Sequence, residues 1–303
     1  MAKTELFVRQ QAGGVYTVTR EDLTTGNIFF VNSATGTNSV GYGNNPDAPF
    51  ASVDYAVSRV TSNKGDRIYV MPGHVETLSA AGSSLGNGGV FIGATLSNGV
   101  SIIGLGVGAN RPAFNYTTAI GASMDITAAN VLIRNCTFTV NFDALTAMVN
   151  VTGADVTFDQ CEFRSVASTT CPVLGILTAA TAARLAVTNS RFLGFAAQTT
   201  TTTAWIKHEV GVDYLIQNNY LSGKCTQAIL NATTILRGLI DNNRIVVTTN
   251  DAIVMAAAST PLISNNRMNV SGGTAPITAA AGFMAGNVYS AAAGVTAGTA
   301  STF

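Results

Sequence analysis

Five acidic residues are the first candidates for chemistry in this sequence: Asp155, Asp159, Glu162, Asp213 and Asp241. Two carboxyl groups on one face of a protein can hydrolyse a glycosidic bond, and the inverting reaction needs them about 6.5–9.5 Å apart. The elements that carry these acids decide whether any two of them form such a pair.

The histidines and cysteines offer little further chemistry. His74 follows a Pro-Gly turn and His208 lies between a lysine and a glutamate, and the sequence places no Ser, Cys or Asp partner that would make either one a catalytic base. We expect both to be structural or solvated. No CxxC motif is present, so we expect no metal site and no cofactor. We predict buried free thiols at Cys136, Cys161, Cys171 and Cys225.

An eight-residue pattern recurs seven times and predicts the fold. It reads VLIRNCTF from Val131, VTFDQCEF from Val156, LAVTNSRF from Leu185, YLIQNNYL from Tyr214, GLIDNNRI from Gly238, PLISNNRM from Pro261 and GFMAGNVY from Gly282. The starts are 25, 29, 29, 24, 23 and 21 residues apart. Short apolar segments precede each unit, and no helical period is present, so each repeat contains two or three short strands.

A period of this length with a recurrent Asn at a turn is typical of one coil of a parallel β-helix. Coils stack at the inter-strand spacing, about 4.8 Å, and bury a continuous apolar core. We therefore predict an all-β, right-handed parallel β-helix of about 7–8 coils with a strand and helix cap at its N-terminal end. A β-sandwich with coincidental similarity between its strands is the alternative.

Equivalent residues of the repeats should stack on one another. The eighth position holds large apolar residues, and we expect a core stack of Phe138, Phe163 and Phe192. The sixth position holds Cys136, Cys161 and Ser190 in the first three units and Asn in the others. Stacked amides can hydrogen-bond from coil to coil, which predicts an Asn ladder of Asn219, Asn243, Asn266 and Asn287.

The stacking distance argues against a catalytic pair of acids. Asp155 and Asp213 would lie roughly 10 Å apart, and Asp159 and Asp241 roughly 14 Å. The residue just before each unit instead alternates in charge along the stack. This alternation predicts a charge ladder of ion pairs, and a role in substrate binding is the alternative for Asp155, Arg184, Asp213 and Arg237.

The N-terminal third reads as a cap. The segment 46–63 predicts a turn and a helix that Asp47 caps and whose apolar face carries Val53 and Val57. We divide the chain into an N-terminal arm (1–26), a β-helix opening with its capping helix (27–98), the coils (99–290) and a C-terminal tail (291–303).

The opening segment carries a family resemblance. The stretch IFFVNSATGTNSVGYGNNPDAPFASVDYAVSRVTSNKGDRIYVMPGHVETL, from Ile28 to Leu78, resembles the start of right-handed parallel β-helix proteins of the pectin-lyase-like class. It also resembles virion proteins of tailed phages. The class contains both enzymes and inert scaffolds, so the resemblance implies the fold and leaves the function open.

Composition favours a protein that works in an assembly. Only 11% of the 303 residues are charged, and 16 basic residues balance 16 acidic ones. A neutral chain of this kind has no electrostatic footprint for nucleic acid or for an anionic membrane. We expect no secretory signal and no transmembrane helix, because no apolar run has the required length. So few charges on a surface suggest that part of it is covered by other subunits.

These observations predict a non-enzymatic structural protein of a tailed-phage virion, either a capsid decoration protein or a spike. It would be assembled in the host cytoplasm as a homotrimer, with other virion proteins such as the major capsid protein as partners and a host surface glycan as a further one. The segments 174–183 and 252–259 are our candidates for the self-associating face. The alternatives are a polysaccharide-cleaving tailspike and a passive glycan-binding fibre, which would need exposed aromatics such as Trp205, Tyr214 or Tyr220.

Overall fold

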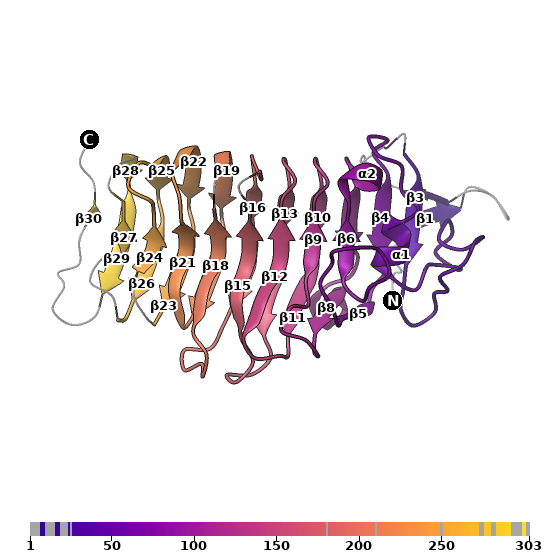
Figure 1. Ribbon diagram of the computed structural model, residues 1–303, viewed down its shortest axis with the longest axis horizontal. Helices are drawn as coiled ribbons and strands as arrows, with labels where there is room; N and C mark the ends of the chain where they lie inside the picture. The colour runs from indigo at the N-terminus through magenta and orange to yellow at the C-terminus, as the bar shows by residue number, and fades with distance from the viewer. Residues whose placement is uncertain are drawn as a thin grey trace.

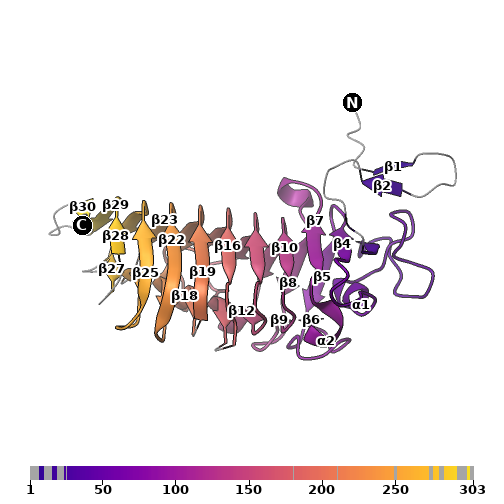
Figure 2. The ribbon, with the colours of Figure 1, turned by 90° about the horizontal axis from the view of Figure 1, so that it is seen from above.

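Each repeat forms one coil of a parallel β-helix of about seven turns, as the sequence predicts (Figure 1). The structure, a computed structural model, describes residues 7–9, 16–18, 24, 26–179, 181–209, 211–248, 251–272, 276–279, 283–291 and 299–300. Three sheets run along the length of the molecule, and each coil from β4–β6 to β25–β27 contributes one strand to each of them in turn. Figure 2 shows the coils side by side along the long axis, with the N-terminal strands at one end.

The first sheet contains the second to fourth residues of the repeat unit. Its ten described strands are β3 (Ile28–Val31), β4 (Arg67–Val70), β7 (Ser101–Gly104), β10 (Leu132–Arg134), β13 (Thr157–Asp159), β16 (Ala186–Thr188), β19 (Gly211–Gln217), β22 (Ile235–Asp241), β25 (Thr260–Ser264) and β28 (Phe283–Ala285). All neighbours in this sheet are parallel and keep equivalent residues in register, such as Ile133 with Phe158.

The second sheet begins at the seventh residue of the unit. Its ten described strands are β5 (Val75–Leu78), β8 (Ala113–Tyr116), β11 (Thr137–Val140), β14 (Glu162–Ser165), β17 (Arg191–Leu193), β20 (Tyr220–Gly223), β23 (Arg244–Val247), β26 (Arg267–Val270), β29 (Asn287–Ala291) and β30 (Thr299–Ala300). Strand β30 pairs antiparallel with β29, and the other neighbours are parallel.

The third sheet contains the apolar segments that lie between the repeat units. Its eight described strands are β6 (Val90–Ile92), β9 (Met124–Ile126), β12 (Leu145–Val151), β15 (Pro172–Thr178), β18 (Thr202–His208), β21 (Cys225–Asn231), β24 (Asp251–Val254) and β27 (Ile277–Thr278). The middle strands are seven residues long, and Figure 1 draws them side by side across the face of the molecule.

The corner between the first and second sheets is two residues long in six successive coils, from β10–β11 to β25–β26. Its first residue is left-handed, with φ between 51° and 58°, and is Asn in five of these coils and Gln160 in the other. Asn tolerates this conformation better than other residues with a side chain. Its second residue is buried. The corner between the second and third sheets varies in length, and it accounts for much of the variation in repeat spacing.

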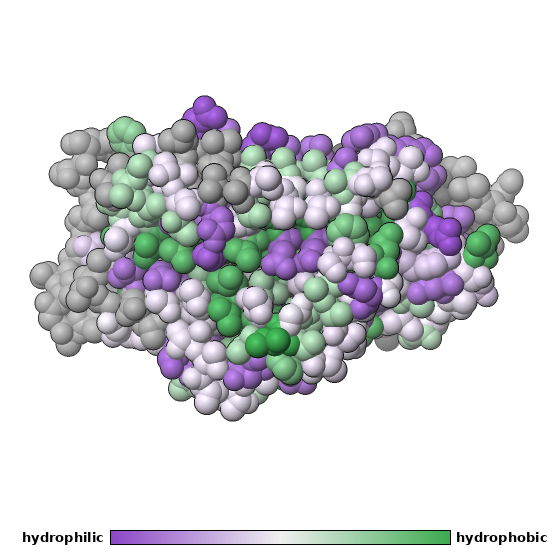
Figure 3. Space-filling view, in the orientation of Figure 1, coloured by the Kyte–Doolittle hydropathy of each residue, from purple (hydrophilic) through white to green (hydrophobic). Residues whose placement is uncertain are grey.

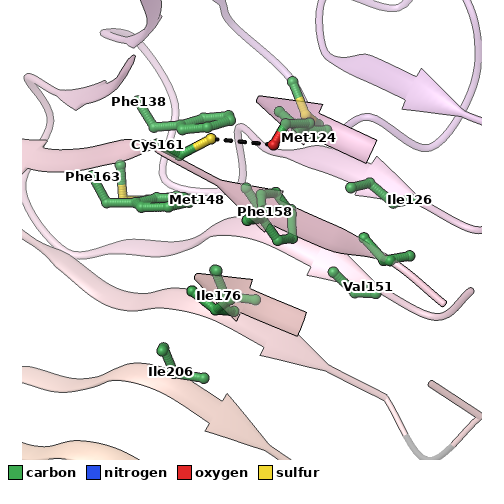
Figure 4. Close-up of a cluster of buried hydrophobic side chains, with 14 of the residues drawn as sticks. Met124, Ile126, Phe138, Met148, Val151, Phe158, Cys161, Phe163, Ile176 and Ile206 are labelled. Atoms are coloured by element: carbon green, nitrogen blue, oxygen red, sulfur yellow. Dashed lines mark hydrogen bonds between the residues drawn. The ribbon is translucent and has the colours of Figure 1, made fainter. Parts of the chain in front are cut away.

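The core is a column of stacked apolar side chains. The rings of Phe138 and Phe163 lie 4.7 Å apart with an interplanar angle of 7°, and those of Phe163 and Phe192 lie 4.6 Å apart at 3°. Figure 4 shows Phe138 and Phe163 with their rings parallel beside Cys161. Met148 and Ile176 of the third sheet are also buried in this core. The predicted phenylalanine stack is therefore present.

The helices are short and lie toward the N-terminal end. They are α1 (Val53–Val57), α2 (Ala94–Ser97) and the 3-10 helix Gly108–Asn110. Helix α1 lies against β3, β4 and β6 and buries Val53 and Val57 at the start of the core. Among the described residues no helix has the length and apolarity needed to cross a membrane.

The prediction that Asp47 caps the first helix is wrong. The N-cap is Ser52, whose hydroxyl accepts a hydrogen bond from the backbone nitrogen of Tyr55 at 3.3 Å. The helix cannot begin earlier, because Phe50 is still extended and donates its backbone N–H to the carbonyl of Phe30 at 2.8 Å.

The two predicted terminal segments are described only in part. In the arm 1–26, β1 (Phe7–Arg9) and β2 (Tyr16–Val18) form an antiparallel pair. Most other residues of the arm, and most of the tail 291–303, lie outside the described residues.

Candidate functional site

The acids that precede the repeat units are held in ion pairs between neighbouring coils. The guanidinium of Arg184 donates two hydrogen bonds to the carboxylate of Asp155, and that of Arg237 donates two to Asp213 at 2.8 and 3.0 Å. All four residues have left-handed backbone conformations. The predicted charge ladder is thus resolved into two bidentate pairs, because no ion pair of 4 Å or less joins Arg184 to Asp213.

Asp159 and Asp241 accept hydrogen bonds on the outer side of the first sheet. Asp159 accepts from Arg134 at 3.0 Å, from Thr188 at 2.9 Å and from Asn189 at 2.8 Å. Asp241 accepts from the side chains of Gln217, Ser264 and Asn265 at 2.7–3.0 Å. Each carboxylate therefore links its own coil to adjacent coils.

These contacts lower the pKa of three of the carboxyl groups. Hydrogen bonds from Arg184 hold the pKa of Asp155 below its ordinary value, Arg237 does the same for Asp213, and Gln217 has the largest such effect on Asp241. A general acid must keep its proton at neutral pH, which requires a raised pKa. The surroundings of these three acids therefore stabilise the ionised carboxylate, which favours a structural role over a role as a proton donor.

The second corner residues form the predicted amide ladder inside the fold. The side-chain oxygen of Asn243 accepts from the backbone nitrogen of Asn219 at 2.9 Å and from its amide nitrogen at 3.0 Å. Asn266 and Asn287 repeat both contacts with the preceding coil. Each amide nitrogen of Asn219, Asn243, Asn266 and Asn287 also donates to a first-sheet carbonyl at 2.7–2.9 Å.

Smaller side chains continue this column toward the N-terminal end. The hydroxyl of Ser190 accepts from the backbone nitrogen of Cys161 at 3.1 Å, and the backbone nitrogen of Ser190 donates to Asn219 at 2.8 Å. Cys136 and Cys161 occupy the next two positions as buried free thiols. Burial raises the pKa of the Cys161 thiol to about 12, so this thiol is protonated and inert.

Both histidines are buried and structural. In His74, Nδ1 accepts from the backbone nitrogen of Ser33 at 3.0 Å, and Nε2 lies 3.2 Å from a carboxylate oxygen of Glu76. That oxygen also accepts from the backbone nitrogen of Val53 at 2.8 Å, so the cluster ties the first turn of α1 to β5.

His208 lies in the core rather than in a solvated charged run. Its Nδ1 is 2.7 Å from the hydroxyl of Thr178 in the preceding coil, and its ring meets that of Tyr214 edge-on at 5.2 Å. Burial lowers its pKa to about 4. Among the described residues no group of three His, Cys, Asp or Glu side chains is arranged to hold a metal ion.

One of the three candidate sugar-stacking aromatics lies on the surface. Trp205 and Tyr214 are buried, and the indole of Trp205 donates to the carbonyl of Ser222 at 3.0 Å. Tyr220 begins β20 and is partly exposed on the outer face of the second sheet. The guanidinium carbon of Arg244 lies 5.5 Å from the centroid of its ring.

A row of arginines accompanies Tyr220, and the sequence reasoning did not identify it. The seventh position of the repeat unit places Glu162, Arg191, Tyr220, Arg244 and Arg267 in register on successive strands of the second sheet. Two shallow hollows of about 530 and 490 Å³ lie over this row and share Arg244. The repeat contains a signal for this row, because the seventh position changes from Glu162 to Arg244 and Arg267 toward the C-terminal coils.

The outer face of the third sheet is the other candidate surface. A small hydrophobic cluster separate from the core consists of Ala147, Leu174 and Ala204, with Leu177 and Leu230 partly buried against it. Figure 3 shows apolar side chains gathered on the face that carries these strands in Figure 1. The two segments predicted for self-association belong here, since β15 and β24 lie in this sheet with only β18 and β21 between them.

Comparison with known proteins supports the fold and does not extend to function. No protein-family model and no curated protein sequence matches the chain. Among solved structures the chain is similar to a rhamnogalacturonan lyase, with a TM-score of 0.53 and 9% sequence identity over 80% of this chain and 74% of that one. The chain therefore has the parallel β-helix fold of that lyase. The resemblance to phage virion proteins has no counterpart in these comparisons.

Proposed function

We propose that this chain is a non-enzymatic structural protein that self-associates through the outer face of its third sheet. The observation that supports this proposal best is the buried hydrophobic cluster of Ala147, Leu174 and Ala204, which is separate from the core. The side chains of Leu177 and Leu230, which pack against it, remain partly exposed. A sheet face of this kind has no role in closing the coil that carries it. A chain with zero formal net charge also meets little electrostatic repulsion from its own copies.

The assembly we propose is a homotrimer that forms part of a tailed-phage virion. Three copies related by a threefold axis could each turn the third sheet toward that axis. The β-helix would then serve as a rigid capsid decoration protein or spike, attached to other virion proteins such as the major capsid protein. The opening segment Ile28–Leu78 supports this placement by its resemblance to virion proteins.

Sedimentation equilibrium over a concentration series tests the self-association. Three copies would have a mass of about 94 kDa, and we expect that species at all but the lowest concentrations. The double variant Leu177→Glu/Leu230→Glu should shift the protein to the 31.2 kDa monomer, because it places charges in the interface. Val107→Glu is the matched control, since Val107 is 81% exposed and lies away from the third sheet. A monomeric wild-type protein would refute the proposal.

A second candidate function is a glycan-binding or glycan-cleaving fibre on the same fold. Tyr220 favours binding, because its partly exposed ring lines the larger of the two hollows over the second sheet. The rhamnogalacturonan lyase provides a precedent for polysaccharide chemistry on a parallel β-helix. An assay for newly formed reducing ends on acidic and neutral polysaccharides tests cleavage, and we expect none. Release of reducing ends by the wild-type protein would establish the enzyme instead.

A further inference from the structure

We propose that the outer face of the second sheet binds a linear anionic polysaccharide, with Arg244 and Arg267 contacting its acid groups. This site deepens the glycan-binding alternative above and rests on it. It lies on a different sheet from the self-associating face, so a homotrimer leaves it accessible.

Among the described residues, Arg244 and Arg267 differ from the five other arginines from Arg134 onward in making no ion pair with an acidic side chain. The seven arginines from Arg134 onward lie within the described coils, and five of them make an ion pair of 4 Å or less with an aspartate or glutamate. Within the described part of the chain, Arg244 and Arg267 make none, and both are exposed. Two adjacent guanidinium groups without counter-charges are available for the carboxylate or sulfate groups of a ligand.

Tyr220 organises the same row. The guanidinium of Arg244 packs over its ring, at a distance where the two attract each other and where the long arginine side chain loses freedom. A partly exposed ring beside a cation suits a sugar unit, whose apolar C–H face packs on the aromatic face while its acid group meets the guanidinium.

The spacing of the row suits a polymer that runs parallel to the helix axis. Arg244 and Arg267 are aligned on adjacent strands, so their Cα atoms are separated by one coil, about 4.8 Å. One sugar unit of an extended chain has a similar length. The two hollows of about 530 and 490 Å³ meet at Arg244 and together follow this direction.

The observations favour a glycan over a single-stranded nucleic acid. Nucleic-acid grooves stack successive bases on several aromatic side chains and carry a strong excess of positive charge. This row contains one aromatic ring, that of Tyr220, and the chain as a whole has a formal net charge of zero. Exposed amides such as Asn242 and Asn269 supply hydrogen-bond partners for hydroxyl groups along the same face.

Isothermal titration calorimetry on the full chain tests the site. The probes are an alginate hexasaccharide, the same oligosaccharide with its carboxyl groups reduced to alcohols, and a dextran sulfate oligosaccharide. We expect the alginate to bind, the reduced form to bind at least about tenfold more weakly, and added salt to weaken binding. Comparison of the affinities for dextran sulfate and alginate shows whether the site prefers sulfate or carboxylate groups.

The variant Arg244→Gln/Arg267→Gln should weaken alginate binding at least about tenfold and leave the melting temperature unchanged. Arg184→Gln is the matched control, because it removes an exposed arginine from a different corner of the coil. Tyr220→Ala should also weaken binding, and Tyr220→Phe should retain it. Equal affinity for the acidic and reduced oligosaccharides, or tighter binding of oligo(dT) than of alginate, would overturn the proposal.

The outcomes for the two proposals are independent. A trimer that does not bind alginate retains the structural role and removes this site. A monomer that binds alginate with the expected loss in the arginine variant retains the site and removes the self-association.

Discussion

The side-chain oxygen of Asn266 accepts two hydrogen bonds from Asn243, one from its backbone nitrogen at 2.9 Å and one from its amide nitrogen at 3.0 Å. The corner of each coil thereby satisfies its buried backbone through the side chain of the next coil. The hydrogen bonds from one amide to the next all run in the same direction along the axis, so they polarise one another.

We expect Asn243→Ala to destabilise the protein by about 2–6 kcal/mol. The change leaves the backbone nitrogen of Asn219 and the carbonyl of Ile216 without these partners in the core, and each buried unsatisfied group costs about 1–3 kcal/mol. Urea unfolding followed by circular dichroism measures the loss. The neighbouring variant Asn242→Gly is the control, because Asn242 is exposed and left-handed, and it should change stability by less than about 0.5 kcal/mol. Equal losses in the two variants would contradict a role for the inner ladder.

The phenylalanine stack should be sensitive to truncation at its centre. Phe163 lies between Phe138 and Phe192 with nearly parallel rings, so Phe163→Ala removes two stacking contacts and opens a cavity. We expect a loss of about 3–5 kcal/mol in the free energy of unfolding. Phe163→Leu retains more of the volume and should lose clearly less. A small effect of the alanine variant would mean that the neighbouring coils collapse into the space.

Stability should fall in acid because of His208. Its pKa is about 4 in the folded protein, against an ordinary value of 6.5, so the unfolded chain binds the proton more tightly between these values. The contribution of the neutral ring is fully present above about pH 6.5 and is lost as the pH falls toward 4, by about 3 kcal/mol. Urea unfolding between pH 4 and 7 measures this slope. His208→Gln should flatten it, and parallel curves for the two proteins would contradict the assignment.

The pKa of Asp155 should respond to its partner in the next coil. Hydrogen bonds from Arg184 hold this pKa below 3.8, so the stability that the pair contributes is present above that value and is lost as the pH falls through the lower folded value. Carboxyl-carbon NMR titration of Arg184→Gln should move the pKa of Asp155 upward. Arg237→Gln should leave it in place and raise the pKa of Asp213 instead. An unchanged Asp155 in Arg184→Gln would mean that another group sets its pKa.

The repeat unit was sufficient to predict the coils, the phenylalanine stack and the amide ladder, because stacking brings equivalent positions together whatever the detailed path of the chain. The left-handed conformation of the residue just before two of the units could not be assigned from the repeat, since Arg184 and Arg237 are not of a residue type typical of that conformation. The cap at Ser52 was missed for a related reason. A pairing between Phe50 and Phe30, distant in sequence, delays the start of the helix.

The candidate surfaces were less predictable than the core. His208 is buried because its side chain is one of those that β18 directs inward. The charged residues on either side of it in the sequence suggest an exposed position instead. The arginine row lies in one register column, yet Arg191 pairs with Glu162, whereas Arg244 and Arg267 make no ion pair of 4 Å or less with any described acid. That difference depends on side-chain geometry across coils and not on the repeat.

The fold does not tolerate insertions equally at its corners. The corner between the first and second sheets is two residues long in six successive coils, whereas the corner between the second and third sheets varies in length. Insertions between the second and third sheets leave the amide ladder and the phenylalanine stack in register, whereas one extra residue at the short corner would shift both. Evolution can therefore diversify one edge of this protein while the opposite edge stays fixed. Foreign peptides grafted at residues 166–171 and 194–201 should be displayed in a line parallel to the helix axis without changing the scaffold that carries them.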